Sequence, residues 1–343
     1  MRWSPLAVPL LTALTVVGCS SGSPGGTRTN GQAGSASQLE SQYQQVVQHV
    51  LPSVVQITTN DSTGSGVVYD NNGDVVTNEH VIASASSVKV VDSVGNKTLQ
   101  AKIIGEFAPD DLAVIRVQSD ASALKPATFG DSSDAQIGQI VLAMGNPLGL
   151  SDSVTQGIIS ATGRTVGGGE PNGGQALITA AIQTSAAINP GNSGGALVGL
   201  NDQVIGIPTL AATLPGQGGL AAGIGFAIPS NTVKNIANQL IKNGKVTNSD
   251  RATLGITAQT AASAAGKPAG VAVLAVNTGG TADNAGVRAG DTIVGINKVG
   301  VDSVEQLESA LAQLQPGSTV HIRYTRGSST ARTGSAKLDS LGS

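Results

Sequence analysis

The pattern of hydrophobic and polar residues predicts a chain dominated by short strands. From Pro52 onward, apolar and β-branched runs are separated by glycine, Asn and Asp turns. The predicted strands cover residues 53–58, 66–69, 75–77, 88–91, 113–117, 140–143, 153–160, 196–198 and 204–207. A turn signal at 71–74 is typical of a hairpin. Strands at this spacing predict an all-β sandwich or barrel with long surface loops at 164–175 and 209–223.

Helical spacing of apolar residues occurs at three places. Residues 231–243 place apolar residues three or four positions apart and are followed by Gly244, which predicts a helix that closes the first domain. Asn231 is the expected N-cap of this helix. Shorter helices are expected over 39–49 and 304–314.

These elements divide the chain into two domains. Residues 39–244 form the first and larger domain, and the polar residues 245–251 are a linker. Residues 252–330 form a second domain in which predicted strands surround one helix. The last residues, 331–343, are polar and are expected to be a loose tail.

The N-terminus has the pattern of a bacterial secretion signal. Arg2 precedes an apolar run over 6–17, which is too short to span a membrane but suits a signal peptide over 1–18. The run ends before Cys19, which resembles the cysteine of a lipobox and is expected to be lipidated after cleavage. Residues 19–38, rich in Gly and Ser, are a predicted flexible tether. The alternative is an ordinary cleavage site beside an unmodified cysteine.

The composition excludes several classes of function. The 343 residues carry a formal net charge of −3, with 12% charged and 2% aromatic residues. A nucleic-acid partner is not expected, because phosphate binding needs clustered Lys and Arg and base stacking needs aromatic rings. A single cysteine forms neither an internal disulfide nor a Cys-based zinc site. We therefore expect no metal and no cofactor.

Three residues carry the candidate chemistry, namely His80, Asp111 and Ser193. A serine hydroxyl is a weak nucleophile until a base lies within hydrogen-bond reach. A histidine supplies that base, and a buried carboxylate fixes its tautomer. The order His, Asp, Ser is that of the chymotrypsin-like β-barrel enzymes. Ser193 lies in a glycine-flanked turn, and the backbone N–H groups of Gly191 and Ser193 are expected to form an oxyanion hole.

Six strings in the chain resemble the HtrA family of trypsin-like serine proteases. Spread over about residues 50–240, they are TNEHV, DLAVIR, VLAMGNPLGL, SVTQGIISATGR, IQTSAAINPGNSGGAL and GIGFAIPSN. The resemblance implies two six-stranded β-barrels with the active site between them and the same triad. Two positions depart from the family's pattern. Glu79 stands where Asn or Ala is common, and Ser185 replaces an aspartate that often helps the loops near the active site communicate.

Neighbouring residues offer alternatives to these assignments. Asp110 lies beside Asp111, but the family places the catalytic carboxylate directly before Leu-Ala, which favours Asp111. His49 and His321 occupy polar positions of a predicted helix and strand and are expected on the surface.

The resemblance also locates a specificity pocket. In trypsin-like enzymes its floor lies six residues before the nucleophile, which here is Ala187, followed by Ile188. No carboxylate awaits Lys or Arg at that position. We therefore expect a preference for small or medium apolar side chains such as Val, Ala or Leu.

The second domain resembles a PDZ domain. Leu254, Gly255 and Ile256 match the family's carboxylate-binding loop, whose backbone N–H groups would hold a C-terminal carboxylate while the peptide adds as a strand. The string GVRAGD over 286–291 fits the turn that follows in such domains. The alternative is that these residues only begin a strand.

Together these features predict an ATP-independent serine endopeptidase that degrades misfolded or C-terminally tagged proteins outside the cytoplasm. No Walker A sequence is present, in agreement with ATP independence. The expected partners are unfolded or misfolded proteins, C-terminal peptides and a bacterial cell membrane reached through a lipid anchor. A homotrimer is implied by the resemblance alone. The alternative is a chaperone or PDZ scaffold that binds unfolded proteins and whose protease site is dormant.

Overall fold

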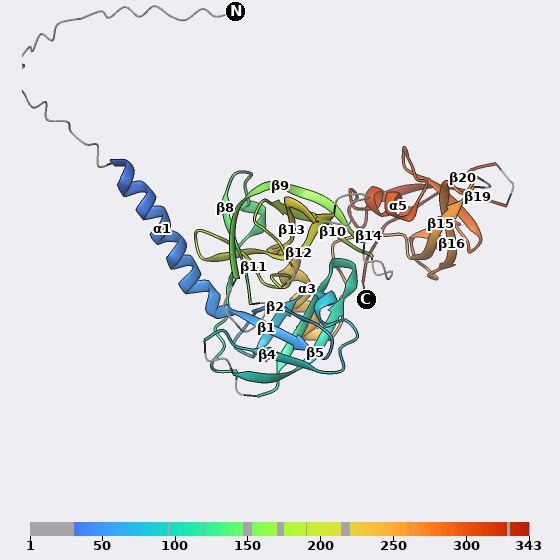
Figure 1. The fold of residues 1–343 in the computed structure, drawn as a ribbon. Coiled ribbons are helices and arrows are strands. Elements are labelled where there is room, and N and C mark those ends of the chain that lie inside the picture. Colours follow the sequence, from blue (N-terminus) through green and yellow to red (C-terminus); the bar gives the residue numbers. More distant parts are fainter. Residues whose placement is uncertain are drawn as a thin grey trace, which may run out of the picture. The chain divides into compact units, whose positions relative to one another are not determined.

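The computed structural model describes most of the chain after its N-terminal segment. The described residues are 31–94, 97–119, 121–146, 153–169, 175–189, 191–213, 220–263, 265–327 and 330–342. The chain forms two units, Met1–Ser41 and Gln42–Ser343, and the second holds all the strands (Figure 1). The predicted signal peptide and Cys19 lie outside the described residues.

The first helix is longer than its apolar pattern predicts. Helix α1 spans Gly31–Val50, so the prediction of a flexible tether over 19–38 is wrong for residues 31–38. Residues 31–38 consist of Gly, Gln, Ala and Ser and contain no proline, so they can extend a helix whose later apolar residues pack against the core. Val46 and Val50 are buried in a core with strand residues.

A closed six-stranded barrel forms the first half of the larger domain. Its strands follow the order β1-β2-β3-β6-β5-β4. They are β1 (Val54–Thr59), β2 (Thr63–Val68), β3 (Asp74–Thr77), β4 (Val88–Val91), β5 (Thr98–Phe107) and β6 (Leu112–Val117). Small aliphatic side chains, chiefly Val and Ile, fill the barrel. The predicted hairpin at 71–74 is present, and its Asn72 N–H donates to Asp70.

The second half is a six-stranded ring with one additional strand. The order is β11-β8-β9-β10-β13-β12-β7, and pairing of β11 with β12 completes the ring. The strands are β7 (Thr128–Phe129), β8 (Ile140–Gly145), β9 (Ser153–Gly169), β10 (Gln175–Thr184), β11 (Ala196–Gly199), β12 (Gln203–Thr213) and β13 (Leu220–Pro229). The two barrels confirm the expected fold class. The prediction of long loops at 164–175 and 209–223 is wrong for the ends of both ranges. Strands β9 and β10 extend into the first range, and β12 and β13 extend into the second.

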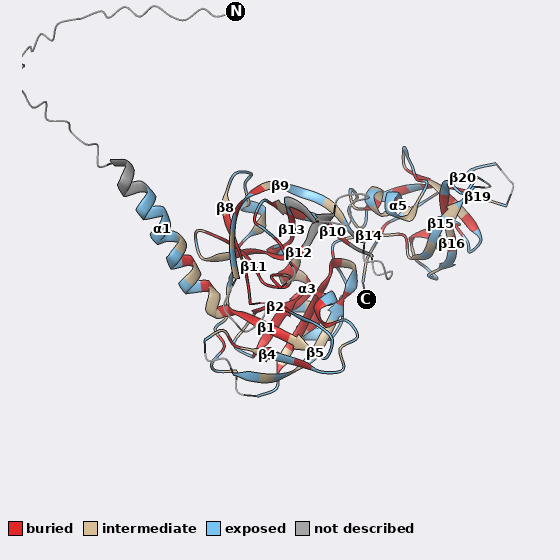
Figure 2. Cartoon of the chain, viewed as in Figure 1, coloured by how far each residue is buried: buried red, intermediate tan, exposed pale blue. Residues whose placement is uncertain are grey.

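A shared apolar core joins the two barrels. It contains side chains of both barrels and of α3 (Ser230–Asn243), close to the predicted helix. Pro229, rather than Asn231, is the N-cap, and Gly244 ends the helix with a φ of +70°. Figure 2 shows most strands of both barrels in the colour of buried residues, whereas β5 and β9 are largely intermediate or exposed. The site described below lies at the ends of strands that contribute to this core.

The smaller domain contains a six-stranded sheet and two helices. Its sheet follows the order β15-β16-β17-β19-β20, with β18 paired to β17. The strands are β15 (Ile256–Ala262), β16 (Pro268–Val276), β17 (Asp291–Ile296), β18 (Val299–Gly300), β19 (Thr319–Arg326) and β20 (Arg332–Lys337), and the helices are α4 (Thr281–Asn284) and α5 (Val304–Leu311). Helix α5 ends earlier than the predicted range 304–314.

The C-terminal residues are part of this domain. The prediction of a loose tail over 331–343 is wrong, because β20 pairs with β19 and β21 (Asp339–Ser340) pairs with β14 (Ala252–Thr253). The hydropathy pattern does not indicate these strands, because their side chains are mostly polar. An edge strand is held mainly by its backbone hydrogen bonds. Residues 331–342 therefore complete the second domain.

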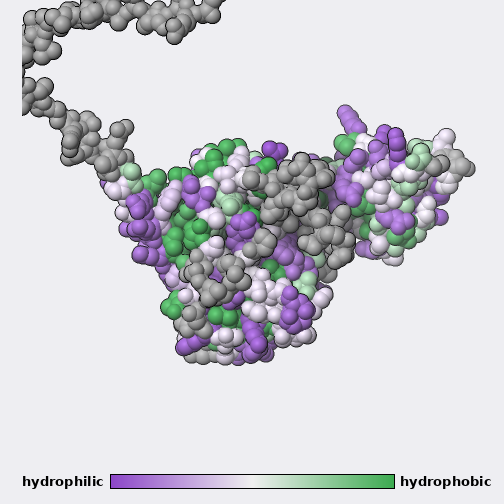
Figure 3. All heavy atoms as spheres, viewed as in Figure 1, coloured by the Kyte–Doolittle hydropathy of each residue, from purple (hydrophilic) through white to green (hydrophobic). Residues whose placement is uncertain are grey.

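The surface of the described residues is mixed in polarity. Large hydrophobic side chains with substantial exposure are Leu39, Val94, Ile137, Val154, Ile158, Ile224, Leu274 and Val299. Figure 3 shows hydrophobic residues in small groups among hydrophilic ones on the visible face. None of the helices described is both long enough and apolar enough to cross a membrane.

Candidate active site

His80 is presented by a short helix that directly follows a buried strand. Strand β3 ends at Thr77, Asn78 is the N-cap, and α2 (Glu79–Ile82) begins one residue before the histidine. The Thr77 hydroxyl donates to Ser65 O at 2.7 Å, which fixes the end of the strand. The imidazole itself is partly exposed, with 38% of the side-chain surface accessible. This placement leaves part of the His80 side chain exposed at the surface.

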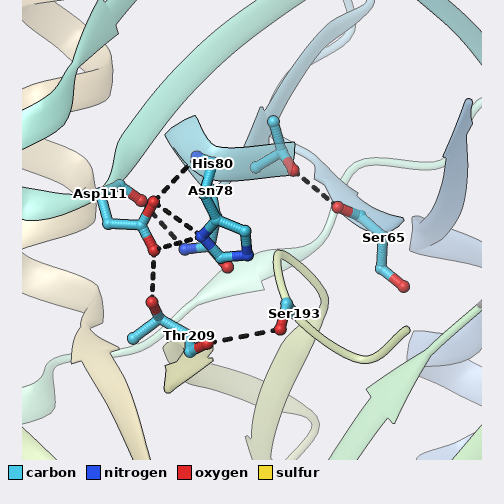
Figure 4. A network of polar contacts seen from close by, with 7 residues as sticks. Ser65, Asn78, His80, Asp111, Ser193 and Thr209 are labelled. Atoms are coloured by element: carbon cyan, nitrogen blue, oxygen red, sulfur yellow. Dashed lines mark hydrogen bonds and ion pairs between the residues drawn. The ribbon is translucent and has the colours of Figure 1, made fainter. Parts of the chain in front are cut away.

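Asp111 holds that imidazole from the buried side. The His80 Nδ1–H donates to the carboxylate, with distances of 2.8 Å to Oδ2 and 2.9 Å to Oδ1, and the His80 backbone N–H donates to Oδ1 at 3.0 Å (Figure 4). The Thr209 hydroxyl donates to Oδ2, and the Asn78 side-chain amide donates to Asp111 O at 3.0 Å. A carboxylate held by this many donors keeps the ring orientation and tautomer fixed.

The backbone at Asp111 has an uncommon conformation. The turn η2 (Ala108–Asp110) precedes it, and Asp111 follows with φ +50° and ψ +45°. A non-glycine residue in the left-handed region costs energy, although Asp tolerates it better than most. The surrounding contacts must therefore hold this turn in place.

The nucleophile turn is anchored to the first barrel through Ser65. The Ser65 N–H donates to Ser193 O at 3.0 Å, and the buried Ser65 hydroxyl donates to Gly191 O at 2.5 Å. Ser65 Oγ in turn accepts from the Asn146 N–H at 2.8 Å. At Gly194, with φ +80°, a Cβ would overlap Ser65 O and the Thr77 hydroxyl, so only glycine fits. The turn is thereby fixed next to the strand that leads to His80.

Thr209 connects the two parts of the site. Its hydroxyl bonds to Asp111, and its carbonyl accepts the Ser193 hydroxyl at 3.4 Å (Figure 4). Thr209 is buried, with 4% exposure. The residues that sequence reasoning names as a triad thus meet in one network, although the serine proton is directed at Thr209 O.

The backbone N–H groups of residues 191–195 fall into two sets. Those of Asn192, Gly194 and Gly195 donate to Asn189 O, Pro208 O and Asn192 O, respectively. Those of Gly191 and Ser193 donate to no acceptor within the described part of the chain. Gly191 has φ +115°, a conformation that glycine adopts readily. The N–H group of Gly191 and that of Ser193 itself are the two that the sequence predicts for an oxyanion hole.

The charges near the triad come from carboxylates and one arginine. Burial raises the pKa of Glu79, and the neighbouring Asp111 and Glu106 raise it further while His80 lowers it. Burial also raises the pKa of Asp110, and the Arg251 guanidinium lowers it in part.

Among the described residues no group of three His, Cys, Asp or Glu side chains is arranged to hold a metal ion.

The expected pocket residues lie beside the nucleophile turn. Ala187 O accepts the Thr155 hydroxyl and the Asn192 side-chain amide, both at 2.9 Å. Ala187 is exposed, whereas Ile188 is 6% exposed. A Cβ at Gly225 would overlap the Ile188 side chain, so β13 lies directly against it. The side chains of Ala187 and Ile188 are apolar and carry no charge.

The expected peptide loop adjoins an edge strand of the second domain. Gly255 has φ +66°, its N–H donates to the Thr253 hydroxyl at 3.2 Å, and Leu254 is buried. Ile256 begins β15, which pairs on one side with β16 and ends the sheet order on the other. The Val304 N–H at the start of α5 donates to the Thr260 hydroxyl of β15 at 3.1 Å, so the helix lies near this strand.

Sequence reasoning did not single out Ser65, Asn78 or Thr209. All three are fully or almost fully buried polar residues. Their partners are distant in sequence: Thr209 and Asp111 are 98 positions apart, and Ser65 and Gly191 are 126. A buried polar residue within an apolar strand was the available signal, but it does not indicate which partner the residue meets.

Comparison with known proteins assigns the chain to a family. Residues 64–207 match the trypsin-like peptidase domain and residues 246–334 the PDZ domain. The chain is 42% identical to the serine protease Do-like HtrA of Lactococcus lactis subsp. cremoris, with 81% of this chain and 70% of that protein covered. It is 37% identical to the serine protease PepD of Mycobacterium tuberculosis, with 84% and 64% covered. It is 39% identical to the periplasmic serine endoprotease DegP of Salmonella typhimurium, with 77% and 54% covered.

Solved structures give the same result. The serine endoprotease from Yersinia pestis superimposes with a TM-score of 0.58 at 33% identity, covering 87% of this chain and 98% of that one. The HtrA-type protease AlgW with a decapeptide gives a TM-score of 0.59 at 29% identity, with 87% and 98% covered. The chain spans between about half and 70% of the length of the three curated relatives named above. On sequence and fold together, the chain belongs to the HtrA family of trypsin-like serine endopeptidases.

Proposed function

We propose that this chain hydrolyses peptide bonds through His80, Asp111 and Ser193, as an ATP-independent endopeptidase acting outside the cytoplasm. The observation that carries the proposal is the hydrogen-bond network that connects Ser193 through Thr209 to Asp111, with His80 held at 2.8 Å on the same carboxylate. Such a constellation identifies acyl-transfer chemistry by its geometry and not by its position in the sequence.

The reaction follows from these contacts. The Ser193 hydroxyl turns from Thr209 O toward His80 Nε2, because catalytic hydrogen bonds tighten when substrate arrives. His80 Nε2 takes the hydroxyl proton as Ser193 Oγ attacks the scissile carbonyl carbon. Asp111 stabilises the imidazolium that forms, and His80 then gives the proton to the leaving amine. Water hydrolyses the acyl-enzyme by the same steps.

The oxyanion and specificity assignments extend this proposal. The N–H groups of Gly191 and Ser193 stabilise the tetrahedral intermediate, each contributing about 3–4 kcal/mol. Ala187 and the buried Ile188 favour a small or medium apolar side chain before the scissile bond. A peptide series in which Arg substrates are cleaved fastest would contradict this specificity.

The second domain is proposed to bind peptide C-termini. The edge strand β15 lets a peptide add to the sheet, and α5 forms the other wall. Leu254, Gly255 and Ile256 would supply N–H groups for the terminal carboxylate, which competes with the Thr253 hydroxyl for Gly255. The bound decapeptide in the AlgW structure supports peptide binding by this family.

Location, assembly and substrates are further parts of the proposal. Relatives are named as periplasmic proteases, and the N-terminal pattern supports export, with Cys19 as the site of a lipid anchor. Mass spectrometry of the mature N-terminus tests that modification. Misfolded proteins are the proposed substrates, and a homotrimer is the proposed assembly, both by resemblance to the family.

A chaperone or scaffold with a dormant protease site is the second candidate. The Ser193 proton, directed at Thr209 O over 3.4 Å, favours it. Casein hydrolysis by the full chain, compared with Ser193→Ala, separates the two functions. If the chain is a protease, it cleaves casein and Ser193→Ala does not. If neither protein cleaves casein, with or without added C-terminal peptides, the result supports the scaffold.

A further inference from the structure

The left-handed turn that presents Asp111 is held by a residue far away in the sequence. Arg251 precedes β14, and its Nη1 donates to Asp110 Oδ1 at 2.7 Å and to Pro109 O at 2.8 Å. Both acceptors belong to η2, the turn whose next residue is Asp111. Arg251 Nη1 therefore binds both residues that directly precede Asp111 in the sequence.

This contact is buried and charged. Asp110 is 1% exposed, and the Arg251 side chain is 14% exposed. The second carboxylate oxygen of Asp110 is buried and has no hydrogen-bond partner within the described residues. Leaving such a carboxylate without its cation is costly, because a buried charge needs a partner. The turn and the ion pair therefore depend on each other.

The other contacts around η2 do not replace the arginine. Strand β10 lies against η2, and Asp111 N–H donates to Ala108 O at 3.0 Å within the turn. The carboxylate of Glu308 in α5 interacts electrostatically with Arg251. The hydrogen bonds of the Arg251 side chain go to Pro109 and Asp110, which directly precede Asp111.

We propose that Arg251 is a positioning residue for peptide hydrolysis, which fixes the η2 turn through Asp110 and thereby aims Asp111 at His80. The inference rests on the proposed function, because it takes Asp111 to be the triad carboxylate. Arg251 does not touch the reacting atoms. Its removal shifts the triad rather than abolishing it, and a shift of about 1 Å in a catalytic group costs up to about 100-fold in rate.

Variants of the full chain test this role. Arg251→Met keeps the aliphatic stem and removes the charge, and we expect kcat to fall about 10-fold or more with KM unchanged within about 2-fold. Arg251→Lys should retain kcat within about 3-fold, because a single nitrogen makes both contacts in the structure.

The matched control is a second arginine that donates hydrogen bonds to a buried aspartate, in this case within the first barrel. Arg116 donates to Asp74 at 2.6 and 2.7 Å, and Asp74 is completely buried. Arg116→Met should lower stability but not the kcat of the folded enzyme. Cleavage of an amidated apolar peptide gives kcat and KM, and the enzyme concentration comes from titration with a fluorophosphonate. Equal kcat losses in Arg251→Met and Arg116→Met would overturn the proposal, as would an unchanged Arg251→Met.

A second measurement does not depend on activity. The proton between His80 Nδ1 and Asp111 gives a strongly downfield proton resonance in NMR spectra. We expect Arg251→Met to shift or broaden this signal and Arg116→Met to leave it in place. If the wild type neither cleaves peptides nor reacts with the fluorophosphonate, the proposed function fails, and the resonance still decides whether Arg251 positions Asp111. An unchanged resonance in Arg251→Met overturns the positioning role.

Discussion

Two histidine–aspartate pairs in this chain have the same distance and different surroundings. His80 Nδ1 lies 2.8 Å from Asp111 Oδ2, and His49 Nδ1 lies 2.8 Å from Asp202 Oδ2. The Asp111 side chain is 5% exposed, whereas that of Asp202 is 42% exposed. Asp111 also accepts from Thr209 and from the His80 backbone, contacts for which the second pair has no counterpart among the described residues.

The difference shows that the carboxylate's surroundings, more than the distance between the two side chains, distinguish the proposed catalytic pair from the surface pair. Water screens the exposed pair, so it restrains neither ring nor carboxylate strongly. At the first pair the buried carboxylate has fixed donors and a low-dielectric environment, so its charge acts fully on the imidazole. The serine network then completes the first pair, while the second remains a surface contact.

The largest expected effect separates the two aspartates. Asp111→Asn keeps the shape of the site but disturbs the His80 tautomer, and we expect kcat to fall about 10⁴-fold. Asp202→Asn should change kcat by less than about 2-fold, because that pair touches no reacting group. Peptide cleavage with both variants at matched folded concentration measures the contrast. Similar losses in the two variants would contradict the assignment of the triad.

The next effect concerns the Thr209 hydroxyl, which donates to Asp111 and has no counterpart at Asp202 among the described residues. Thr209→Val removes the hydroxyl bond to Asp111 at nearly constant volume, and the loss of a bond to a charged group costs about 1.5–3 kcal/mol. We expect kcat to fall about 10-fold to 100-fold. Thr209→Ser is the control, since it keeps the hydroxyl and should remain within about 3-fold of wild type. A valine variant as active as the serine variant would show that this bond does not matter.

A smaller effect is expected from Glu79, the carboxylate beside the catalytic pair. Its pKa is raised by burial and by Asp111, so Glu79 ionises only as pH rises above the usual range for Glu. Once ionised it favours a protonated His80, so Glu79→Gln should move the acid limb of kcat/KM a few tenths of a pH unit lower. A pH–rate profile of both proteins measures this, and a shift to higher pH would contradict it.

The same raised pKa gives a stability effect of known sign. The folded state binds the Glu79 proton more tightly than the unfolded chain, so wild-type stability falls as pH rises from about 4.3 through the folded pKa. Glu79→Gln removes this loss and should be slightly more stable than wild type at pH 7. The difference should vanish below about pH 4. Since Glu79 is only half-buried, we expect at most a few tenths of a kcal/mol.

The sequence predicts the catalytic pair better than it predicts the strands around it. The order His80, Asp111, Ser193 carries chemical information that needs no structure. Strands β5, β10 and β13 do not stand out in the hydropathy pattern, because they alternate irregularly or are rich in Ala and Gly. The pairing of β9 with β10 also contains register shifts, which disturb the two-residue period on which strand prediction depends.

The anchors of the site are less predictable than its reactive groups. Thr209 falls within a stretch predicted as a loop, and the structure places it in β12 beside Asp111. Arg251 falls within a predicted polar linker, yet its side chain is only 14% exposed and contacts Asp110. Both residues act through contacts with groups about a hundred or more positions away, and hydropathy contains no information on which distant groups meet.

The smallest expected effect lies at the surface pair. His49→Ala removes the contact with Asp202, whose two side chains are 59% and 42% exposed. Exposed ion pairs contribute about 0.2–1 kcal/mol, and this one exists as an ion pair only where His49 is protonated. We therefore expect a loss of less than about 0.5 kcal/mol at pH 7, with kcat unchanged, and a further decrease of the difference in high salt. Denaturant unfolding of the wild type and the variant at two salt concentrations measures it. A loss of several kcal/mol in the free energy of unfolding would show that surrounding groups stabilise this pair, as they do at His80 and Asp111.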